Sequence, residues 1–128
     1  MQWDASANAG FTSAEKPWLA VNPNYETINA AAALADPDSI YHYTQRLLSL
    51  RKSALAFVYG DYEDLAPKHP SLFLFARTLG NDRYLIALNF SRETIAVPNI
   101  VAQGNLILSN GAGTSRELKG WEARIVLA

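Results

Sequence analysis

The sequence predicts a mainly β protein, with an antiparallel β-sandwich over residues 57–128 that follows a long loop and one α-helix. Two observations predict this arrangement. Apolar residues recur at steps of three and four up to about residue 54, and they alternate at steps of two beyond it. The alternating runs are short and are separated by turn residues such as Gly80-Asn81, which is typical of antiparallel sandwiches or barrels. We therefore expect a domain boundary near residue 56.

Composition narrows the class of protein. The 128 residues are 49% apolar, which is enough to build a core, and the formal net charge is −1. Because Lys and Arg form no cluster that would neutralise phosphates, nucleic acid is not an expected partner. No apolar run approaches the roughly 20 residues of a membrane helix, so no membrane contact is expected either. The chain has no cysteine and no signal-peptide pattern at its start, so we expect a cytoplasmic protein.

Residues 1–29 are expected to form a long loop. Two clusters of turn residues, Asn8-Ala9-Gly10 and Val21-Asn22-Pro23-Asn24, interrupt any regular pattern. Large aromatic residues nevertheless occur through the segment, at Trp3, Phe11, Trp18 and Tyr25. Aromatic side chains stabilise a fold by burying a large area, so this loop is expected to pack against something larger.

Two helices are expected next. Residues 30–35 form one or two turns that begin at Asn29, a favoured N-cap, and end before Pro37. A longer helix over residues 38–53 starts with Asp36 or Asp38 as its cap. Its apolar residues lie on one face and form a stripe of Ile40, Tyr43, Leu47, Leu50 and Ala54.

The rest of the chain is expected to be strands. The runs 57–59, 71–78, 83–90, 94–97, 106–108 and 121–127 alternate or are rich in apolar residues. Gly80-Asn81 marks a tight hairpin between two of them, and Pro98 ends another. The aromatic residues of these runs are expected in the core because they lie among aliphatic residues; they are Phe73, Phe75, Phe90 and Trp121.

No group of residues forms a catalytic or metal-binding pattern. His42 and His69 are isolated, so each is interpreted as solvated or bonded to its neighbours. The acids Asp61, Glu63 and Asp64 are the densest cluster, but three acids in one turn-and-strand segment are typical of a solvated edge that discourages strand pairing. We therefore expect no catalytic residue, no metal and no cofactor.

Three further patterns are weak. Gly111-Ala112-Gly113-Thr114 is too short for a phosphate-binding loop and lacks its lysine. The serines lack the Gly-x-Ser-x-Gly pattern of a nucleophile elbow. Asn89-Phe90-Ser91 matches a glycosylation sequon inside a strand run, and we interpret it as a chance match.

Specific residues extend the interpretation beyond composition and periodicity. The chain resembles the oligo-1,6-glucosidases and related α-glucosidases of the α-amylase superfamily of glycoside hydrolases. The resemblance starts in the loop, with Met1-Gln2-Trp3-Asp4, Asn8-Ala9-Gly10-Phe11-Thr12, Lys16-Pro17-Trp18 and Val21-Asn22-Pro23-Asn24-Tyr25. It continues to Tyr59-Gly60-Asp61-Tyr62, Asn89-Phe90-Ser91 and Trp121-Glu122-Ala123-Arg124, so it covers essentially the whole chain.

The resemblance implies a division of the chain and a reaction. Residues 1–56 are similar to the last loop and helix of a (β/α)8 catalytic barrel, and residues 57–128 to the C-terminal antiparallel β-sandwich domain. The family hydrolyses α-glucosidic bonds with retention, through an Asp nucleophile, a Glu acid and a second Asp. In the family these carboxylates lie on barrel strands before the matching segment, so no acid of this chain corresponds to them. The resemblance thus implies a C-terminal piece that is itself non-catalytic and stabilises the barrel.

The same resemblance implies partners. The loop after a barrel strand lies on the catalytic face, so Trp3, Asp4, Asn8 and Phe11 are candidates for the rim of the substrate pocket. A role in folding the loop is the alternative for all four. The expected partners are the catalytic barrel and, through the complete enzyme, an oligosaccharide substrate. The exposed helix stripe also predicts self-association of the isolated chain.

Two other functions remain open at the level of sequence. The chain is alternatively a stand-alone carbohydrate-binding β-sandwich module, or a structural domain without sugar contact. A carbohydrate-binding module needs exposed, co-planar aromatic rings on its sheet, and the strand patterns place the aromatic rings in the core instead.

Overall fold

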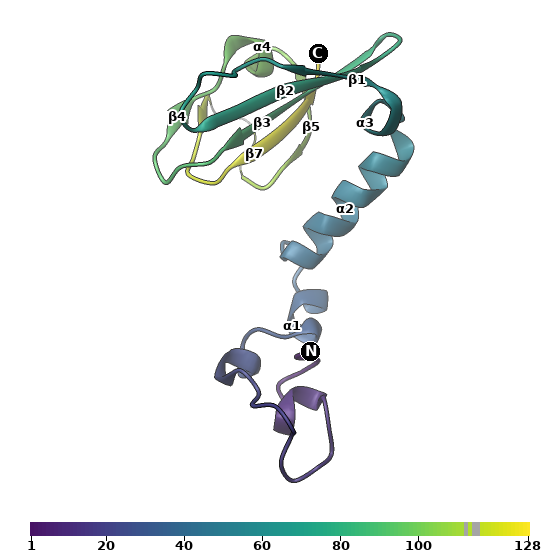
Figure 1. Ribbon diagram of the computed structural model, residues 1–128, viewed down its shortest axis with the longest axis vertical. Coiled ribbons are helices and arrows are strands. Elements are labelled where there is room, and N and C mark those ends of the chain that lie inside the picture. The colour runs from purple at the N-terminus through teal and green to yellow at the C-terminus, as the bar shows by residue number, and fades with distance from the viewer. Residues whose placement is uncertain (112, 114–115) are drawn as a thin grey trace. The chain divides into compact units, whose positions relative to one another are not determined.

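The computed structural model describes residues 1–111, 113 and 116–128 (Figure 1). It contains two compact units, Met1–Leu48 and Ser49–Ala128, and each is described by itself. Ala112 and Thr114, which belong to the glycine-containing loop considered above, lie outside the described residues. No helix in the described part of the chain has the length and apolar content needed to cross a membrane.

The first unit is a loop that closes on itself. It contains two 3-10 turns, η1 (Ala7–Gly10) and η2 (Pro23–Glu26), and the short helix α1 (Ala30–Ala35). Asn29 caps α1 as predicted: its Oδ1 accepts from Ala32 N at 2.8 Å, and its Nδ2 donates to Tyr25 O at 2.8 Å. Because both halves of its amide are bonded, Asn29 remains buried beside the loop backbone.

The beginning of the chain completes the first turn of α1. The first N–H groups of a helix have no partner inside the helix. Here Ala30 N and Ala31 N donate to Gln2 O and Trp3 O, both at 2.9 Å. The Gln2 side chain also donates to Asn24 Oδ1 at 3.1 Å and to Ile28 O. These bonds hold the two ends of the loop together.

The long helix α2 (Ile40–Ser53) forms as predicted, but its cap is a different residue. Ser39 Oγ accepts from His42 N at 3.4 Å, while Asp36 Oδ1 binds the N–H of Asp38 at 2.9 Å in the preceding turn. The sequence offered three capping side chains in four positions, and the serine is the one that directly precedes the helix. No residue of α2 is buried, and Ile40 of the apolar stripe is 85% exposed.

The second unit is built on one antiparallel sheet. Its strands are β1 (Asp61–Asp64), β2 (Leu72–Leu79), β3 (Asp82–Asn89), β5 (Asn105–Ser109) and β7 (Ala123–Leu127). They lie in the order β1-β2-β3-β7-β5, and every neighbouring pair is antiparallel. The predicted hairpin joins β2 and β3 with Leu79 opposite Asp82, and Gly80 supplies the left-handed conformation at φ 60° that glycine adopts without strain.

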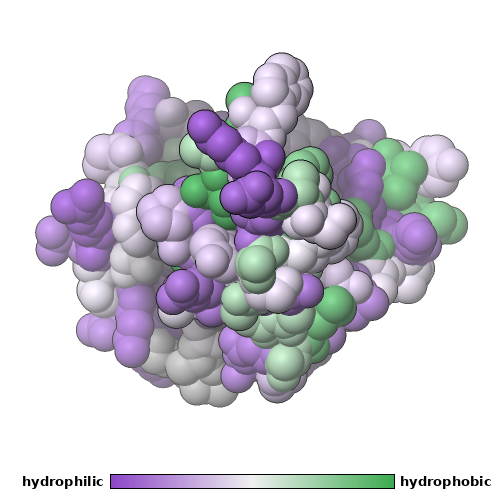
Figure 2. All heavy atoms as spheres, turned by 90° about the horizontal axis from the view of Figure 1, so that it is seen from below, coloured by the Kyte–Doolittle hydropathy of each residue, from purple (hydrophilic) through white to green (hydrophobic). Residues whose placement is uncertain are grey.

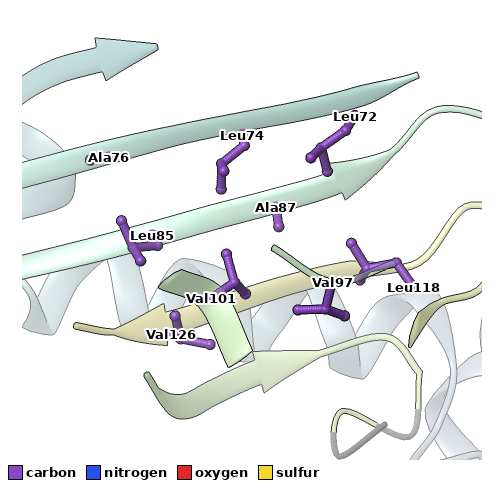
Figure 3. Close-up of a cluster of buried hydrophobic side chains, with 9 residues drawn as sticks. All are labelled: Leu72, Leu74, Ala76, Leu85, Ala87, Val97, Val101, Leu118 and Val126. Atoms are coloured by element: carbon purple, nitrogen blue, oxygen red, sulfur yellow. The ribbon is translucent and has the colours of Figure 1, made fainter. Parts of the chain in front are cut away.

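A smaller layer covers one face of this sheet. It consists of the two-residue strands β4 (Ile95–Ala96) and β6 (Glu117–Leu118), which pair with each other, and the short helix α4 (Asn99–Ala102). Alternate residues of β2, β3 and β7 point toward it and meet its apolar side chains (Figure 3). The resulting core contains Leu72, Leu74, Ala76, Leu85, Ala87, Val97, Val101, Leu118 and Val126.

The predicted strand at 57–59 is wrong, because this segment forms the helical turn α3 (Ala56–Tyr59). Two arginines bind its carbonyl oxygens: Arg51 Nη1 donates to Phe57 O at 2.7 Å, and Arg77 Nε donates to Ala56 O at 3.3 Å. The Phe57 ring also packs against Tyr84, with ring centroids 4.6 Å apart. These tertiary contacts override the strand preference of an aromatic and β-branched run. We call Arg51, α3, Arg77 and Tyr84 the joint.

Two other expectations near the end of the chain are corrected. The strand expected at 94–97 is reduced to Ile95–Ala96. Trp121 precedes the last strand in a left-handed conformation at φ 63°, and it is 58% exposed rather than buried. The core prediction also fails for Phe73 and Phe90, which are 38% and 60% exposed, while Phe75 is half-buried. These phenylalanines lie on the face of the sheet that points away from the core layer. Both faces of the strand pattern are apolar, so alternation alone does not tell which face is buried.

Candidate functional site

The acidic cluster lies on the edge strand β1. Asp61, Glu63 and Asp64 are all exposed. Glu63 pairs with Arg83 at 2.9 Å, and Asp64 Oδ1 accepts from Ala66 N at 3.0 Å. Charged residues on an edge strand discourage pairing with other chains, and this geometry agrees with that role. In the described part of the chain, no three His, Asp or Glu side chains gather to hold a metal ion.

Both histidines are bonded to nearby backbone. His42 Nε2 lies 3.0 Å from Leu34 O. His69 Nδ1 accepts from Ser71 N at 3.2 Å and from Leu72 N at 2.7 Å, where β2 begins. The interpretation of both residues as locally bonded is confirmed, and His69 acts as an acceptor for the start of a strand.

One ion pair is buried beneath the small layer. Arg124 and Glu122 pair at 2.8 Å, with side chains 3% and 4% exposed. Burial alone would raise the pKa of Glu122, but the backbone N–H of Lys119, the Arg124 guanidinium and the backbone N–H of Gly113 together hold that pKa below its ordinary value. A carboxylate held ionised by these three groups and closed off from solvent is suited to structure rather than to proton transfer.

The loop of the first unit contains an unusual backbone turn. Asn8, Ala9 and Gly10 are all left-handed, at φ 55°, 58° and 63°. Alanine, the residue at position 9, rarely adopts the left-handed conformation in proteins, because it costs roughly 1–2 kcal/mol per residue. Here it is 1% exposed, its N–H donates to Ser6 O at 2.9 Å, and its carbonyl accepts from Trp3 N at 2.9 Å. Such strain persists only where surrounding contacts hold it, and it is frequent at functional sites.

Asp4 and Gly10 face each other across this turn. A Cβ atom at Gly10 would lie 2.6 to 2.8 Å from the Asp4 carboxylate and would displace it, and the left-handed backbone at this position favours glycine. The Asp4 carboxylate accepts hydrogen bonds from the hydroxyl and the N–H of Ser6, and these lower its pKa. Asp4 is therefore bonded within the loop, as is Asn8, whose Nδ2 donates to Ala14 O at 2.8 Å and to Thr12 O at 3.4 Å.

A cavity of about 270 Å³ lies beside the left-handed turn. The structure brings two of the four predicted rim residues, Asn8 and Phe11, to its wall. Trp3 and Asp4 are not among its lining residues, and Trp3 is 50% exposed. The full lining consists of Met1, Gln2, Asn8, Ala9, Phe11, Leu19, Ala20, Val21 and Asn22.

The sequence interpretation missed Gln2 and Asn22 as cavity residues. Their separation of twenty positions carries no local signal, because only closure of the loop brings them together. Asn22 was recognised as a turn residue, and it does bond its own turn, where its Oδ1 accepts from Asn24 N at 3.3 Å.

A second surface feature is a row of aromatic rings on the sheet face opposite the core layer, which we call the aromatic ridge. It consists of Tyr62, Phe75, Phe73 and Phe90. Successive ring centroids are 5.5, 5.0 and 6.4 Å apart, and successive rings are tilted by 35°, 35° and 37°. The rings therefore form a curved apolar surface rather than one flat platform.

Comparisons with known proteins agree over nearly the whole chain. The family model described as alpha-amylase, catalytic domain, matches residues 1–60. An oligo-1,6-glucosidase of Parageobacillus thermoglucosidasius is 43% identical over 98% of this chain. The trehalose-6-phosphate hydrolase of Escherichia coli K12 is 42% identical over 73% of it.

Solved structures agree as well. The isomaltulose synthase of Erwinia rhapontici NX5 is 37% identical over 98% of this chain, with a TM-score of 0.88. The chain spans a quarter or less of the length of the relatives it matches: 24% of the oligo-1,6-glucosidase, 17% of the trehalose-6-phosphate hydrolase and 24% of the isomaltulose synthase.

Proposed function

We propose, because this chain belongs to the α-amylase superfamily of glycoside hydrolases, that it is the C-terminal part of an α-glucosidase-type enzyme. In this proposal residues 1–56 complete the catalytic barrel, and residues 57–128 form the C-terminal antiparallel β-sandwich that stabilises it. The observation that carries the proposal is the position of the catalytic-domain match, which ends at Gly60, next to the first strand of the sheet. A cytoplasmic location is part of the same proposal.

The chain itself is proposed to be non-catalytic. Retaining glycosidases hold two carboxyl groups roughly 5 Å apart across the scissile bond, one as acid and one as nucleophile. Of the described acids, Glu122 is enclosed by its ion pair, Asp4 is bonded within its turn, and those of β1 lie on a solvated edge. The carboxylates of the reaction are proposed to come from the rest of the barrel.

The proposal predicts that the 128-residue chain and a complete chimeric enzyme differ in hydrolytic activity. The 128-residue chain is expected to give no hydrolysis of p-nitrophenyl α-glucoside above buffer. A chimera in which this chain replaces the matching quarter of the P. thermoglucosidasius oligo-1,6-glucosidase is expected to be active, because the two sequences are 43% identical over 98% of this chain. Turnover by the chain alone that disappears in the variant D61N/E63Q/D64N would place the carboxylates on β1 and contradict the proposal.

The aromatic ridge supports a protein partner for the sheet. The alternative function, a stand-alone carbohydrate-binding module, gains support from the exposure of Phe73 and Phe90. However, a flat sugar ring stacks on co-planar rings, and these are tilted by 37°. Exposed apolar patches on soluble proteins commonly mark interaction sites, so we assign the ridge to packing within the complete enzyme.

Self-association of the isolated chain is expected for the same reason. Of the apolar stripe on α2, Ile40 is 85% exposed and Leu47 38% exposed. Figure 2 shows that hydrophobic residues also lie on the surface of the molecule among hydrophilic ones. Removing such area from water stabilises contact by roughly 25 cal/mol per Å². The expected result in size-exclusion chromatography with light scattering is a mass above 14.1 kDa that falls on dilution. A clean monomer at high concentration would contradict it.

A further inference from the structure

The sequence contains one Asn-Gly pair, Asn110-Gly111, and the structure places it directly after the edge strand β5. Both residues are exposed. An asparagine is chemically labile when glycine follows it, because glycine has no Cβ to keep its backbone nitrogen away from the side-chain carbon Cγ of the asparagine. The pair is therefore a candidate for a spontaneous modification whose only other reactant is water.

The packing of Gly111 explains why glycine stands at this position. A Cβ atom there would lie 2.6 Å from Cδ and 2.9 Å from Oε1 of Glu122. Because Glu122 is buried in its ion pair with Arg124, a side chain at position 111 would disturb that pair. The residue that avoids this crowding is also the one that makes Asn110 labile.

Three hydrogen bonds oppose the modification in the folded protein. Asn110 Oδ1 accepts from Ala123 N at 2.7 Å, and its Nδ2 donates to Trp121 O at 3.0 Å, so the amide is held against the segment that enters β7. The backbone nitrogen of Gly111 is engaged as well, because it donates to Ser109 Oγ at 3.0 Å. Since β5 lies at the edge of the sheet, its end can open without unfolding the other strands.

We propose that Asn110 is a site of spontaneous deamidation and that these three hydrogen bonds control its rate. When the end of β5 opens, Gly111 N loses its proton to solvent and attacks Cγ of Asn110. The bond from Cγ to Nδ2 breaks, Nδ2 takes a proton from solvent and leaves as ammonia, and a succinimide ring remains. Water then opens the ring at either carbonyl carbon, which gives aspartate or isoaspartate. The net change is one water molecule taken up and one ammonia released.

The two products disturb the fold to different degrees. In aspartate, a carboxylate oxygen replaces Nδ2 and faces Trp121 O, so one hydrogen bond is lost at an exposed position. In isoaspartate, the main chain runs through Cβ and Cγ of residue 110, so it gains a carbon atom and shifts Gly111 against Glu122. Isoaspartate is therefore expected to weaken the buried ion pair, whereas Asn110→Asp, which reproduces the first product alone, leaves that pair intact.

The test is to incubate the 128-residue chain at neutral pH and physiological temperature, and to follow its asparagines by peptide mass spectrometry and by isoaspartate methyltransferase labelling. Asn110 is expected to convert. Asn105 is the internal control, because it is exposed at the other end of β5 but is followed by leucine. In guanidinium chloride, where the three bonds are lost, Asn110 is expected to convert about tenfold faster, which corresponds to about 1.4 kcal/mol.

Two variants of Ser109 test the hydrogen bond to the attacking nitrogen. Ser109→Ala removes the acceptor of the Gly111 N–H and is expected to speed the conversion of Asn110 several-fold in the folded chain. Ser109→Thr keeps a hydroxyl and is expected to match the wild-type rate. Circular dichroism checks that both variants are folded.

Three results would overturn the proposal. Conversion of Asn105 at the rate of Asn110 would show that the Asn-Gly pair has no special lability. An intact Asn110 in the folded chain, after the denatured chain has converted fully, would reject the site. Equal rates for Ser109→Ala and the wild-type chain would reject control by the hydrogen bond to Ser109.

Discussion

Replacing Arg124 with methionine is expected to lower the free energy of unfolding by about 3–5 kcal/mol, because it leaves the Glu122 carboxylate buried without its cation. Methionine retains most of the apolar stem of arginine, so the loss measures the missing charge and hydrogen bonds of the guanidinium, including the bond to Glu117 O, rather than a large cavity. Urea denaturation followed by circular dichroism gives the difference directly.

The matched control is the double variant E122Q/R124M, which is neutral at both positions. It is expected to recover much of the stability lost in R124M, because replacing a whole buried ion pair is often close to neutral. If R124M alone unfolds no more easily than the wild-type protein, the pair contributes nothing and the interpretation of this site as structural fails.

The pH dependence has a definite sign. In the folded protein the pKa of Glu122 is below its ordinary value, so its ionised form stabilises the fold above the unfolded pKa. This contribution is lost as the pH falls through the lowered folded pKa. In R124M, burial raises the pKa of Glu122, and of the three groups named above only the backbone N–H donors still lower it. The destabilisation is therefore expected to be greatest near neutral pH, where the carboxylate is charged. It is expected to shrink in acid, where the carboxyl group becomes protonated.

Asn89→Asp is expected to destabilise the second unit by about 3–5 kcal/mol, since it exchanges a donor for a charge in a buried site. Asn89 is 2% exposed. Its Nδ2 donates to Glu93 O at 2.7 Å, Leu118 O at 3.2 Å and Lys119 O at 2.9 Å. A carboxylate oxygen in place of Nδ2 would face three carbonyl oxygens and repel each of them.

Asn110→Asp provides the control for this change. Asn110 is exposed, and among the described residues its Nδ2 donates to one acceptor, Trp121 O, at 3.0 Å. The same chemical change is expected to cost at most about 1.5 kcal/mol there. Thermal unfolding of the two variants, at neutral pH and again in acid, separates the effects, because protonation restores a donor at position 89. Equal losses of stability in the two variants would contradict the inference that the buried hydrogen bonds of Asn89 stabilise the second unit.

The burial of Asn89 also bears on the sequon in which it lies. Its Oδ1 accepts from Ser91 N at 3.1 Å and from Ser91 Oγ at 2.7 Å, so both halves of the side-chain amide are bonded inside the fold. A glycan requires an accessible amide, and this one becomes accessible only when the strand end opens. The structure therefore agrees with the interpretation of the sequon as a chance match.

Elements with a local cause were predictable from sequence. The β2–β3 hairpin has Gly80 in its turn, and α1 has Asn29 as its N-cap, so a local signal was enough to place both. The conformation of the segment at 57–59 was not predicted correctly, because its helical turn depends on arginines in other elements. Arg51 comes from α2 and Arg77 from β2. Propensity describes isolated segments, and here distant partners decide the conformation.

The candidate cavity was only half predictable for a similar reason. Asn8 and Phe11 belong to one short turn, and the resemblance to a known family pointed to them. Gln2 and Asn22 reach the same wall only because the start of the chain bonds to α1 and closes the loop. Closure depends on backbone hydrogen bonds and on the Gln2 side chain, whose partners lie more than twenty positions away, so no local sequence pattern records it.

The joint couples the unfolding of α2, α3 and β2. Its two arginines hold consecutive carbonyl oxygens of α3, one from the last turn of α2 and one from β2. If β2 opens, α3 loses a donor, and if the end of α2 frays, it loses the other. The last turn of α2 is therefore expected to unfold together with the sheet that follows it. This turn belongs to the second unit, although α2 begins in the first unit. A single helix thus belongs to two units, and its two ends are expected to unfold with different neighbours.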